Sequence, residues 1–493
     1  MEDLWLGFTV AVSLVNLAYC TGGVALGTAI GVLPGVGSVA AVSLLLPVTF
    51  YLDPTTALIL LAGVYYGAEY GGSTASILLN IPGTPSSAVS CLEGYPMSRQ
   101  GRAGVALCMS AIASFVGGTL GILVLMTLAP VVIAFALSFG AAEYFAAMLL
   151  ALIIVASIAR GSPLKGLAMV IVGLLLGGVG TDVISGVARF DLNFPQLYSG
   201  ISVVVLAMGL FGVSEVIASV RITEGRAISA NVTLRSMLPT RDDVRRSVFP
   251  VLRGFGIGSV IGPLPGIGPV VASFLSYAAE KRLARDPSRF GNGAIEGLTG
   301  PEASNNAAAQ TAFIPMLTMG IPGTVTTAIM LGALMIHGIM PGPRLITEHP
   351  SLFWGVVASF WIGNVILLML NIPLVGVWVN LLRIPYRYLY PVIICLVCIG
   401  TYSVNFSTFD VWLVLLLGAL GYAMRLFGYE PAPLLISFIL GPLLEENLRR
   451  AMLLSGGDPT VFFTRSLSLV LLLTSFAILG FMLIRSVVAG RGT

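Results

Sequence analysis

The chain has 493 residues, of which 57% are hydrophobic and only 10% are charged. Soluble globular domains carry about 25% charged residues, so this composition excludes a soluble enzyme, a nucleic-acid-binding protein and a disordered chain. The formal net charge of +3 is uninformative by itself, because orientation in a membrane follows the distribution of Lys and Arg between loops.

Stretches without Asp, Glu, Lys or Arg occupy much of the chain, namely 4–52, 103–142, 192–214, 303–343 and 349–382. About 20 mostly apolar residues cross a bilayer as a helix, so several stretches can hold one or two crossings. A β-barrel would show short alternating segments instead. We therefore predict an all-α polytopic membrane protein with about ten full spans and two re-entrant hairpins.

The first predicted elements are a hairpin over 23–51 and a broken helix over 54–92. The hairpin turns at the Pro-Gly sequence in "GVLPGVGS", and the broken helix is interrupted at "NIPGT" (80–84). Proline removes a helix hydrogen bond and glycine favours turns, so both sequences predict breaks within apolar helices. Spans are expected near 103–128, 142–158, 165–180 and 200–220.

An Arg-rich linker over 221–247 follows, and we predict that it is cytoplasmic because cytoplasmic loops collect Lys and Arg. A second hairpin over 254–279 turns at "GPLPGIG", and a second broken helix over 296–335 is interrupted at "GIPGT" (320–324). Basic residues flank 254–279 at both ends, and so short a stretch cannot cross a bilayer twice. We therefore expect this hairpin to enter and leave the membrane on the cytoplasmic side.

The second half of the chain resembles the first. "GTAIGVLPGVGSVAAV" at 27–42 matches "GSVIGPLPGIGPVVAS" at 258–273 with an offset of 231 residues, and the two Ile-Pro-Gly-Thr motifs match with an offset of 240. Between them, "AEYGGSTAS" matches "PEASNNAAA" with an offset of 233. This alignment makes Glu69 the counterpart of Glu302.

Basic residues alternate between equivalent loops of the two halves. "EKRLARDPSRF" after the second hairpin is basic, whereas "LPVTFYLDPTT" after the first has no Lys or Arg. After the Ile-Pro-Gly-Thr motifs the order reverses, in "EGYPMSRQGRAG" and "PGPRLITEHP". We therefore predict that 1–230 and 231–493 are inverted repeats, an arrangement typical of secondary transporters.

Polar residues of the apolar stretches gather beside these breaks. A break frees N–H groups that suit a carboxylate and carbonyl groups that suit a cation such as Na⁺. Serine and threonine in membrane helices often serve packing, and a buried acid can cap a broken helix, so structural roles stay open. The candidate polar residues for substrate are Ser38, Asn80, Thr84, Ser304, Asn305, Asn306 and Thr324, and those for a coupling cation are Glu69, Ser73, Thr74 and Glu302.

Other chemistry finds little support in the sequence. The chain has two His and no cluster of His with acidic residues, so we predict neither a catalytic triad nor a transition-metal site. Cys395-x-x-Cys398 is flanked by Val, Ile and Leu, and we interpret its cysteines as small core residues. We expect no enzymatic activity and no cofactor apart from a coupling ion, Na⁺ or H⁺.

Long sequences around these motifs resemble one known family. They include "GAEYGGSTASILLNIPGTPSSAVSCLEGYPMSRQGRAGVAL", "EGLTGPEASNNAAAQTAFIPMLTMGIPGTVTTAIMLGAL" and "LGPLLEENLRRAMLLSGGDPTVFF". They resemble the large membrane subunit (TctA type) of tripartite tricarboxylate transporters. The glycine-rich signatures of that family fall on Gly31, Pro34, Gly35, Gly37, Pro82, Gly83, Gly262, Pro265, Gly266, Gly268, Pro322 and Gly323. Among them we add Gly35, Gly37, Pro82, Gly83, Gly266, Gly268, Pro322 and Gly323 to the candidate substrate-binding residues.

The resemblance implies a multi-pass protein of the bacterial inner (cytoplasmic) membrane. It also implies a small four-helix membrane subunit and a periplasmic substrate-binding protein as partners, besides membrane lipid. We therefore expect an ion-coupled importer of a small carboxylate, either a tricarboxylate such as citrate or a dicarboxylate, with elevator-like movement by analogy with other hairpin transporters. The alternatives are a passive anion channel, a membrane scaffold subunit and an intramembrane enzyme that uses the two acids.

Overall fold

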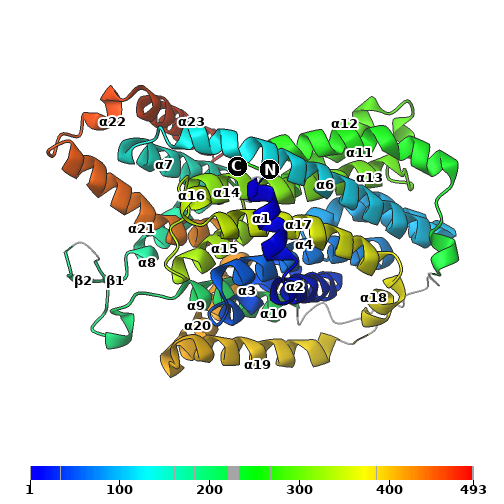
Figure 1. The fold of residues 1–493 in the computed structure, drawn as a ribbon, viewed down its shortest axis with the longest axis horizontal. Helices are drawn as coiled ribbons and strands as arrows, with labels where there is room; N and C mark the ends of the chain where they lie inside the picture. The colour runs from blue at the N-terminus through cyan, green and yellow to red at the C-terminus, as the bar shows by residue number, and fades with distance from the viewer. Residues whose placement is uncertain are drawn as a thin grey trace.

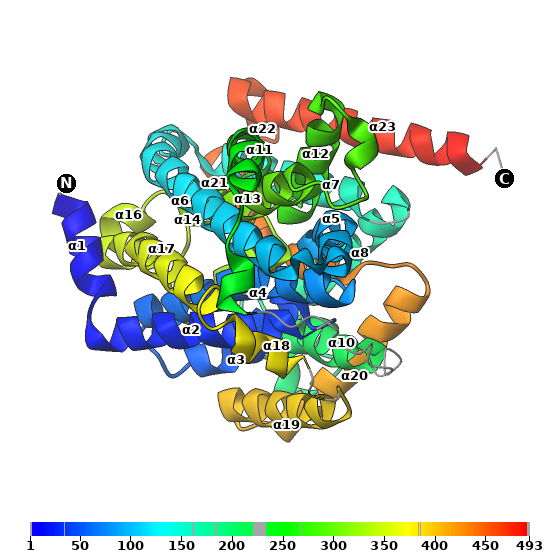
Figure 2. The same cartoon turned by 90° about the vertical axis from the view of Figure 1, so that its right-hand side faces the viewer.

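The described part of the chain consists mainly of helices joined by loops, and it contains one short antiparallel pair of strands, β1 (Gly180–Thr181) and β2 (Ala188–Arg189). The computed structural model describes residues 2–33, 35–159, 162–182, 185–219, 233–266, 268–382, 384 and 386–490. Figures 1 and 2 show α19 and α23 at opposite edges of the molecule, with α4 between them.

The helices before the linker include the first predicted hairpin and broken helix. Their bounds are α1 Glu2–Ala11, α2 Leu14–Val32, α3 Gly37–Thr49, α4 Pro54–Leu79, α5 Ser90–Met97, α6 Ala103–Ala136, α7 Ala141–Ile158, α8 Pro163–Gly177, α9 Val203–Ala207 and α10 Ser214–Ser219. A π-helical segment over Met208–Val213 joins the last two. The chain therefore breaks between α2 and α3 and again after α4, at the predicted Pro-Gly and Ile-Pro-Gly-Thr sequences.

The helices after the linker follow a similar order. Their bounds are α11 Arg241–Ile261, α12 Gly268–Leu283, α13 Glu296–Thr311, α14 Phe313–Met319, α15 Val325–Ile336, α16 Leu345–Glu348, α17 Pro350–Asn371, α18 Val375–Leu381, α19 Tyr386–Asn405, α20 Thr408–Leu426, α21 Pro431–Leu454, α22 Val461–Thr464 and α23 Ser466–Gly490. Much of the predicted linker over 221–247 lies outside the described residues. Its last part belongs to α11 and continues into the predicted hairpin without a break.

The chain is a multi-pass membrane protein. By length and composition, seven helices of the described part are apolar enough to cross a membrane, and shorter apolar helices such as α3, α8 and α15 add to them. The expectation of about ten spans and two re-entrant hairpins stays a prediction. The prediction for the Cys pair is wrong in part, because Cys395 is exposed on α19 and Cys398 is half-buried.

Two helices form the centre of the molecule. Nearly every residue of α4 and of α13 is buried, on all sides of each helix, which is the burial expected of a helix surrounded by others. Asp53 caps the start of α4 by accepting a hydrogen bond from the Thr55 amide at 3.0 Å. The helix ends at Asn80, whose φ of 59° is the left-handed conformation that commonly closes a helix.

Glycines allow α2 to lie directly against α4. A Cβ added at Gly27 would lie only 2.2 Å from the Val64 carbonyl oxygen, so only glycine fits this contact. The same close contact occurs one turn away on either side, at Gly23 against Leu60 and at Gly31 against Ala68. Small residues at four-residue spacing let membrane helices approach closely, and here they fix the register of α2 on α4.

The same type of contact joins α11 to α13 in the second half. A Cβ at Gly258 would lie 2.2 Å from the Ser304 carbonyl oxygen, and a Cβ at Gly254 or Gly262 would also contact backbone of α13, at Gly300 and Ala308 respectively. The glycines of α11 follow those of α2 by 231 residues, whereas their partners on α13 follow those on α4 by 240. The extra residues therefore lie between α12 and α13, in the loop over 284–295.

This register corrects one predicted equivalence. With the offset of 240 that applies along α4 and α13, Glu69 corresponds to Ala309, and Glu302 corresponds to Ala62. The predicted pairing of Glu69 with Glu302 is therefore wrong. The acid of each half lies on the equivalent helix, but at a position two turns away from the acid of the other half.

Candidate functional site

The two breaks of each half contact one another. In the second half the Gly266 amide donates a hydrogen bond to the Gly323 carbonyl oxygen at 2.9 Å. In the first half a Cβ at Gly83 would lie 2.2 Å from the Gly31 carbonyl oxygen. The Pro-Gly turn and the Ile-Pro-Gly-Thr turn therefore form one connected region in each half.

The turns need glycine for their backbone conformation. Gly35, Gly37, Gly266 and Gly268 have φ values of 88°, 70°, 77° and 50°. These values lie in the left-handed region of backbone conformation, which residues with a Cβ atom adopt only at a cost in free energy. Gly268 also lies so close to Thr324 that a Cβ would meet its methyl carbon at 2.9 Å. These glycines shape the site, whereas the predicted signature residue Pro34 lies outside the described residues.

The Ile-Pro-Gly-Thr turns have matching hydrogen bonds. The Thr84 amide donates to the Ser87 hydroxyl at 3.1 Å, and the Thr324 amide donates to the Thr327 hydroxyl at 2.9 Å. Thr324 is the N-cap of α15, so the first amides of that helix point into the turn. Asn80 is exposed at the end of α4, while Pro82 is exposed and Pro322 is buried in their turns.

Glu69 lies where the two halves meet. Its carboxylate is 3% exposed and accepts a hydrogen bond from the Ser86 hydroxyl, which follows the first Ile-Pro-Gly-Thr turn. Three further polar side chains lie close enough to act as hydrogen-bond donors to this carboxyl group. They are Ser38 at the start of α3, Thr84 in the turn and Asn305 on α13. This Glu69 cluster therefore joins predicted site residues of both halves.

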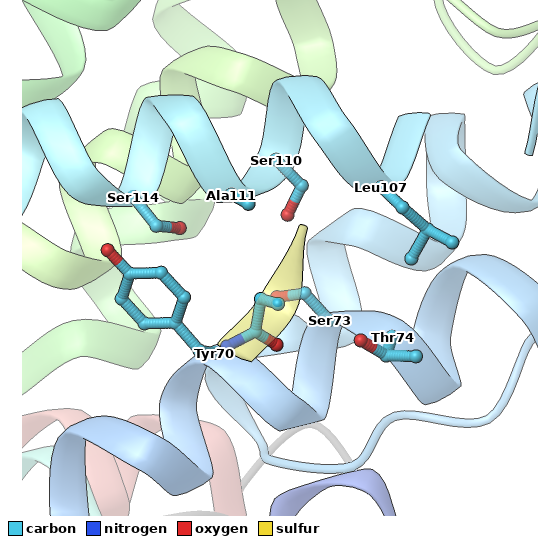
Figure 3. A pocket seen from close by; sticks show the side chains of 8 residues that line it. Tyr70, Ser73, Thr74, Leu107, Ser110, Ala111 and Ser114 are labelled. Carbon is cyan, nitrogen blue, oxygen red and sulfur yellow. The ribbon is translucent and has the colours of Figure 1, made fainter. Parts of the chain in front are cut away.

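Glu302 lies in a second group of hydroxyls. Its carboxylate is 1% exposed and accepts hydrogen bonds from Ser90 and, at 3.1 Å, from Ser114. The hydroxyls of Ser73 and Ser110 also lie close enough to act as hydrogen-bond donors to this carboxyl group. Figure 3 shows the small pocket beside it, which is lined by Tyr70, Ser73, Thr74, Leu107, Ser110, Ala111, Ser114 and Asn371.

The structure thus divides the predicted cation residues between two places. Ser73 and Thr74 line the pocket, and Ser73 also lies next to Glu302, whereas Glu69 belongs to the other cluster. On α13, Ser304 and Asn305 have buried side-chain oxygens without a hydrogen-bond partner. The Asn306 amide instead donates to the Glu302 carbonyl oxygen of its own helix at 3.0 Å, which is a local role.

Sequence reasoning missed the hydroxyls that α6 supplies. Ser110 and Ser114 lie one turn apart in an apolar helix and face Tyr70 and Ser73 on α4. Their four-residue spacing was a usable signal, because it places both side chains on one face. Ser90 was missed as well, since nothing in its local sequence indicates that it contacts Glu302 in the other half.

The chemistry of the site is that of oxygen ligands and free backbone amides. Within the described residues there is no group of three or more His, Cys, Asp or Glu side chains that could hold a metal ion. The arrangement can hold a small anion at the amide-rich turns and a hard cation at the hydroxyl and carboxylate oxygens.

Comparison with known proteins shows the family of the chain. A protein of Agrobacterium vitis, described as an uncharacterized 52.8 kDa protein in the TAR-I ttuC' 3'region, is 49% identical over 491 residues, covering 100% of this chain and 98% of the relative. An uncharacterized protein in the TAR-II ttuC' 3'region of the same organism is 56% identical over 215 residues, 44% of this chain and 89% of the relative. No solved structure matches. Residues 17–436 match the tripartite tricarboxylate transporter TctA family, and the chain therefore belongs to this family of transporter components, which is not a family of enzymes.

Proposed function

We propose that the protein is a secondary active importer of small carboxylates, coupled to a cation and located in the bacterial inner membrane. It works with a periplasmic substrate-binding protein and a small four-helix membrane subunit. Membership of the family supports a tricarboxylate such as citrate as the substrate, with a dicarboxylate as the alternative. The observation that carries the proposal is the Glu69 cluster, where hydroxyl and amide side chains of both halves surround one buried acid.

The substrate binds at the turns beside this cluster. The N-termini of α3 and α15 lie at the two kinds of break, and a helix N-terminus offers free N–H groups and a partial positive charge to a carboxylate. No Lys or Arg occurs in 4–52 or 303–343. The anion is therefore held by backbone amides, by side chains such as Asn305 and by a cation bound in the same region.

Alternating access follows from the arrangement of the halves. We propose that they are inverted repeats, so that the same helix–turn–helix element faces opposite sides of the membrane. The recurring contacts of α2 with α4 and of α11 with α13 support the repeat, and the alternation of basic residues between equivalent loops supports its inversion. The part that bears the hairpins moves against the remaining helices in an elevator-like manner, which is an analogy with other transporters.

The test is uptake of radiolabelled citrate and dicarboxylates into vesicles that contain all three subunits, repeated with each subunit omitted. We expect accumulation against the substrate gradient only with an inward cation gradient and with the binding protein present. Uptake that equilibrates without any ion gradient would indicate a passive anion channel and contradict the proposal. Full uptake in vesicles that lack this chain would show that the chain does not carry the substrate, and would favour a scaffold role.

A further inference from the structure

The Glu302 carboxyl group lies behind the hydroxyls that line a small pocket, and no described basic side chain pairs with it. Glu302 is 1% exposed, and its hydrogen-bond partners are hydroxyls. Every ion pair among the described residues involves other acids. Burying an unpaired carboxylate is unfavourable, so the charged form of Glu302 favours a bound cation.

The groups around the pocket offer oxygen atoms that can accept a cation. Ser73 is 3% exposed, and its hydroxyl oxygen has no hydrogen-bond partner of normal geometry. Tyr70 donates its proton away from the pocket, to the Asn364 side-chain oxygen at 2.8 Å. The Asn371 side-chain nitrogen donates to the Leu367 carbonyl oxygen at 2.9 Å. The oxygen lone pairs of Tyr70 and Asn371 therefore remain available.

The size and composition of the pocket select the type of cation. The space has room for about one water-sized group. Hydroxyl, amide and carboxylate oxygens are hard ligands that suit Na⁺, Mg²⁺ or Ca²⁺ and do not favour transition metals. One carboxylate supplies a single negative charge, which balances a monovalent ion.

We propose that Glu302, Ser73, Ser110 and Ser114 form a sodium-ion site. Ser73 comes from α4, Ser110 and Ser114 come from α6, and Glu302 comes from α13, so the ion holds three helices of both halves together. The role of this sodium site in transport rests on the proposed function, whereas binding of Na⁺ at the site does not.

The position of the site explains how the ion acts on the substrate. Helix α4 supplies Ser73 to the sodium site and Glu69, one turn away, to the Glu69 cluster. Helix α13 likewise supplies Glu302 to the sodium site and Asn305, three residues later, to the Glu69 cluster. Binding of Na⁺ therefore orders the two helices that place Glu69 and Asn305, which is a direct route for reciprocal coupling between the sites.

The test measures Na⁺ binding to the purified full chain, without substrate or partner subunits. The apparent dissociation constant is obtained from ²²Na⁺ binding and from Na⁺-dependent thermal stabilisation, with choline keeping the ionic strength constant. We expect saturable binding in the wild type, loss of binding in Glu302→Gln, and about a tenfold weaker constant in Ser110→Ala, because one oxygen ligand is worth roughly 1–1.5 kcal/mol. The Thr127→Ala control should bind normally, since Thr127 lies on α6 and bonds only to its own helix.

Each outcome decides between explanations. Gel filtration identifies variants that fail to fold, and Ser110→Ala keeps the test valid if Glu302→Gln is one of them. Normal Na⁺ binding in both variants would overturn the site, as would stabilisation that depends on Glu302 and pH but not on Na⁺. Loss of Na⁺ binding in the variants combined with Na⁺-independent uptake in vesicles would preserve the site and refute ion coupling.

Discussion

Glu93 anchors the loop that distinguishes the second half from the first. This acid on α5 is fully buried, and its carboxylate accepts hydrogen bonds from the Tyr277 hydroxyl at 2.8 Å and from three backbone amides of the loop. The amides belong to Gly291, Gly293 and Ala294, at 2.5, 2.8 and 2.7 Å. Because Gly291 and Gly293 adopt φ values of 90° and 92°, successive N–H groups of the loop point at one anion.

Glu93→Gln keeps the shape of the side chain and removes its charge. One oxygen becomes an NH₂ group that faces two N–H or O–H donors, so two of the four hydrogen bonds are lost. A hydrogen bond to a charged group is worth about 1.5–3 kcal/mol, so the loop loses roughly 3–6 kcal/mol of local stability. Since 1.4 kcal/mol corresponds to a factor of ten, amide exchange should accelerate about 100-fold or more.

Hydrogen–deuterium exchange of peptides covering 284–295 measures this effect directly. Glu348→Gln is the matched control, because the Glu348 side chain is 60% exposed and its ion pair with Arg344 is long, at 4.0 Å. We expect the control to exchange like the wild type. Unchanged exchange of the loop in Glu93→Gln would refute the reasoning, because it would mean that the four hydrogen bonds do not hold the loop.

Three further predictions concern packing, backbone strain and pH. Gly27→Ala should destabilise the fold by about 1–3 kcal/mol through its clash with α4, whereas Gly22→Ala on the same helix meets nothing within 4 Å and should not, as thermal unfolding in detergent will show. Gly266→Ala should cost about 1–2 kcal/mol because its φ is 77°, and it should lower the rate of citrate uptake more than the amount of folded protein. Burial alone would raise the pKa of Asp243, but hydrogen bonds from Arg102 and Thr240 outweigh it and hold the pKa below its usual range. The Asp243 contribution to stability is therefore complete above the unfolded-state pKa and is lost as the pH falls through the lower folded-state value, and Asp243→Asn should remove this acid dependence.

The breaks of the helices could be located from the sequence, because Pro and Gly act locally. Helix α4 ends at Leu79 and α14 ends at Met319, so that in each case a single residue separates the end of the helix from the Ile-Pro-Gly-Thr motif. The Pro-Gly turn after α2 was found for the same reason. Local chemistry decides where a helix stops, so no tertiary information was needed.

The equivalence of the acids could not be predicted in the same way. The match of "AEYGGSTAS" with "PEASNNAAA" depends on small residues that occur throughout membrane helices. The register is instead fixed by the contacts of Gly27 with Val64 and of Gly258 with Ser304, which lie far apart in the sequence. The partners of Glu302 were missed because Ser90 and Ser114 are also distant from it along the chain.

The corrected register gives the two acids different roles in an otherwise matching framework. If Glu69 and Glu302 occupied equivalent positions, each would have the same neighbours from the opposite half, and one kind of site would occur twice. Instead, Ala309 replaces the acid at the counterpart of Glu69, and Ala62 replaces it at the counterpart of Glu302. Glu69 therefore lies beside the first Ile-Pro-Gly-Thr turn, where we propose that the anion binds, while Glu302 lies beside Ser90 and Ser114, where we propose that the cation binds. The two central helices α4 and α13 each contribute to both, so neither site can change its occupancy without affecting the helices that form the other.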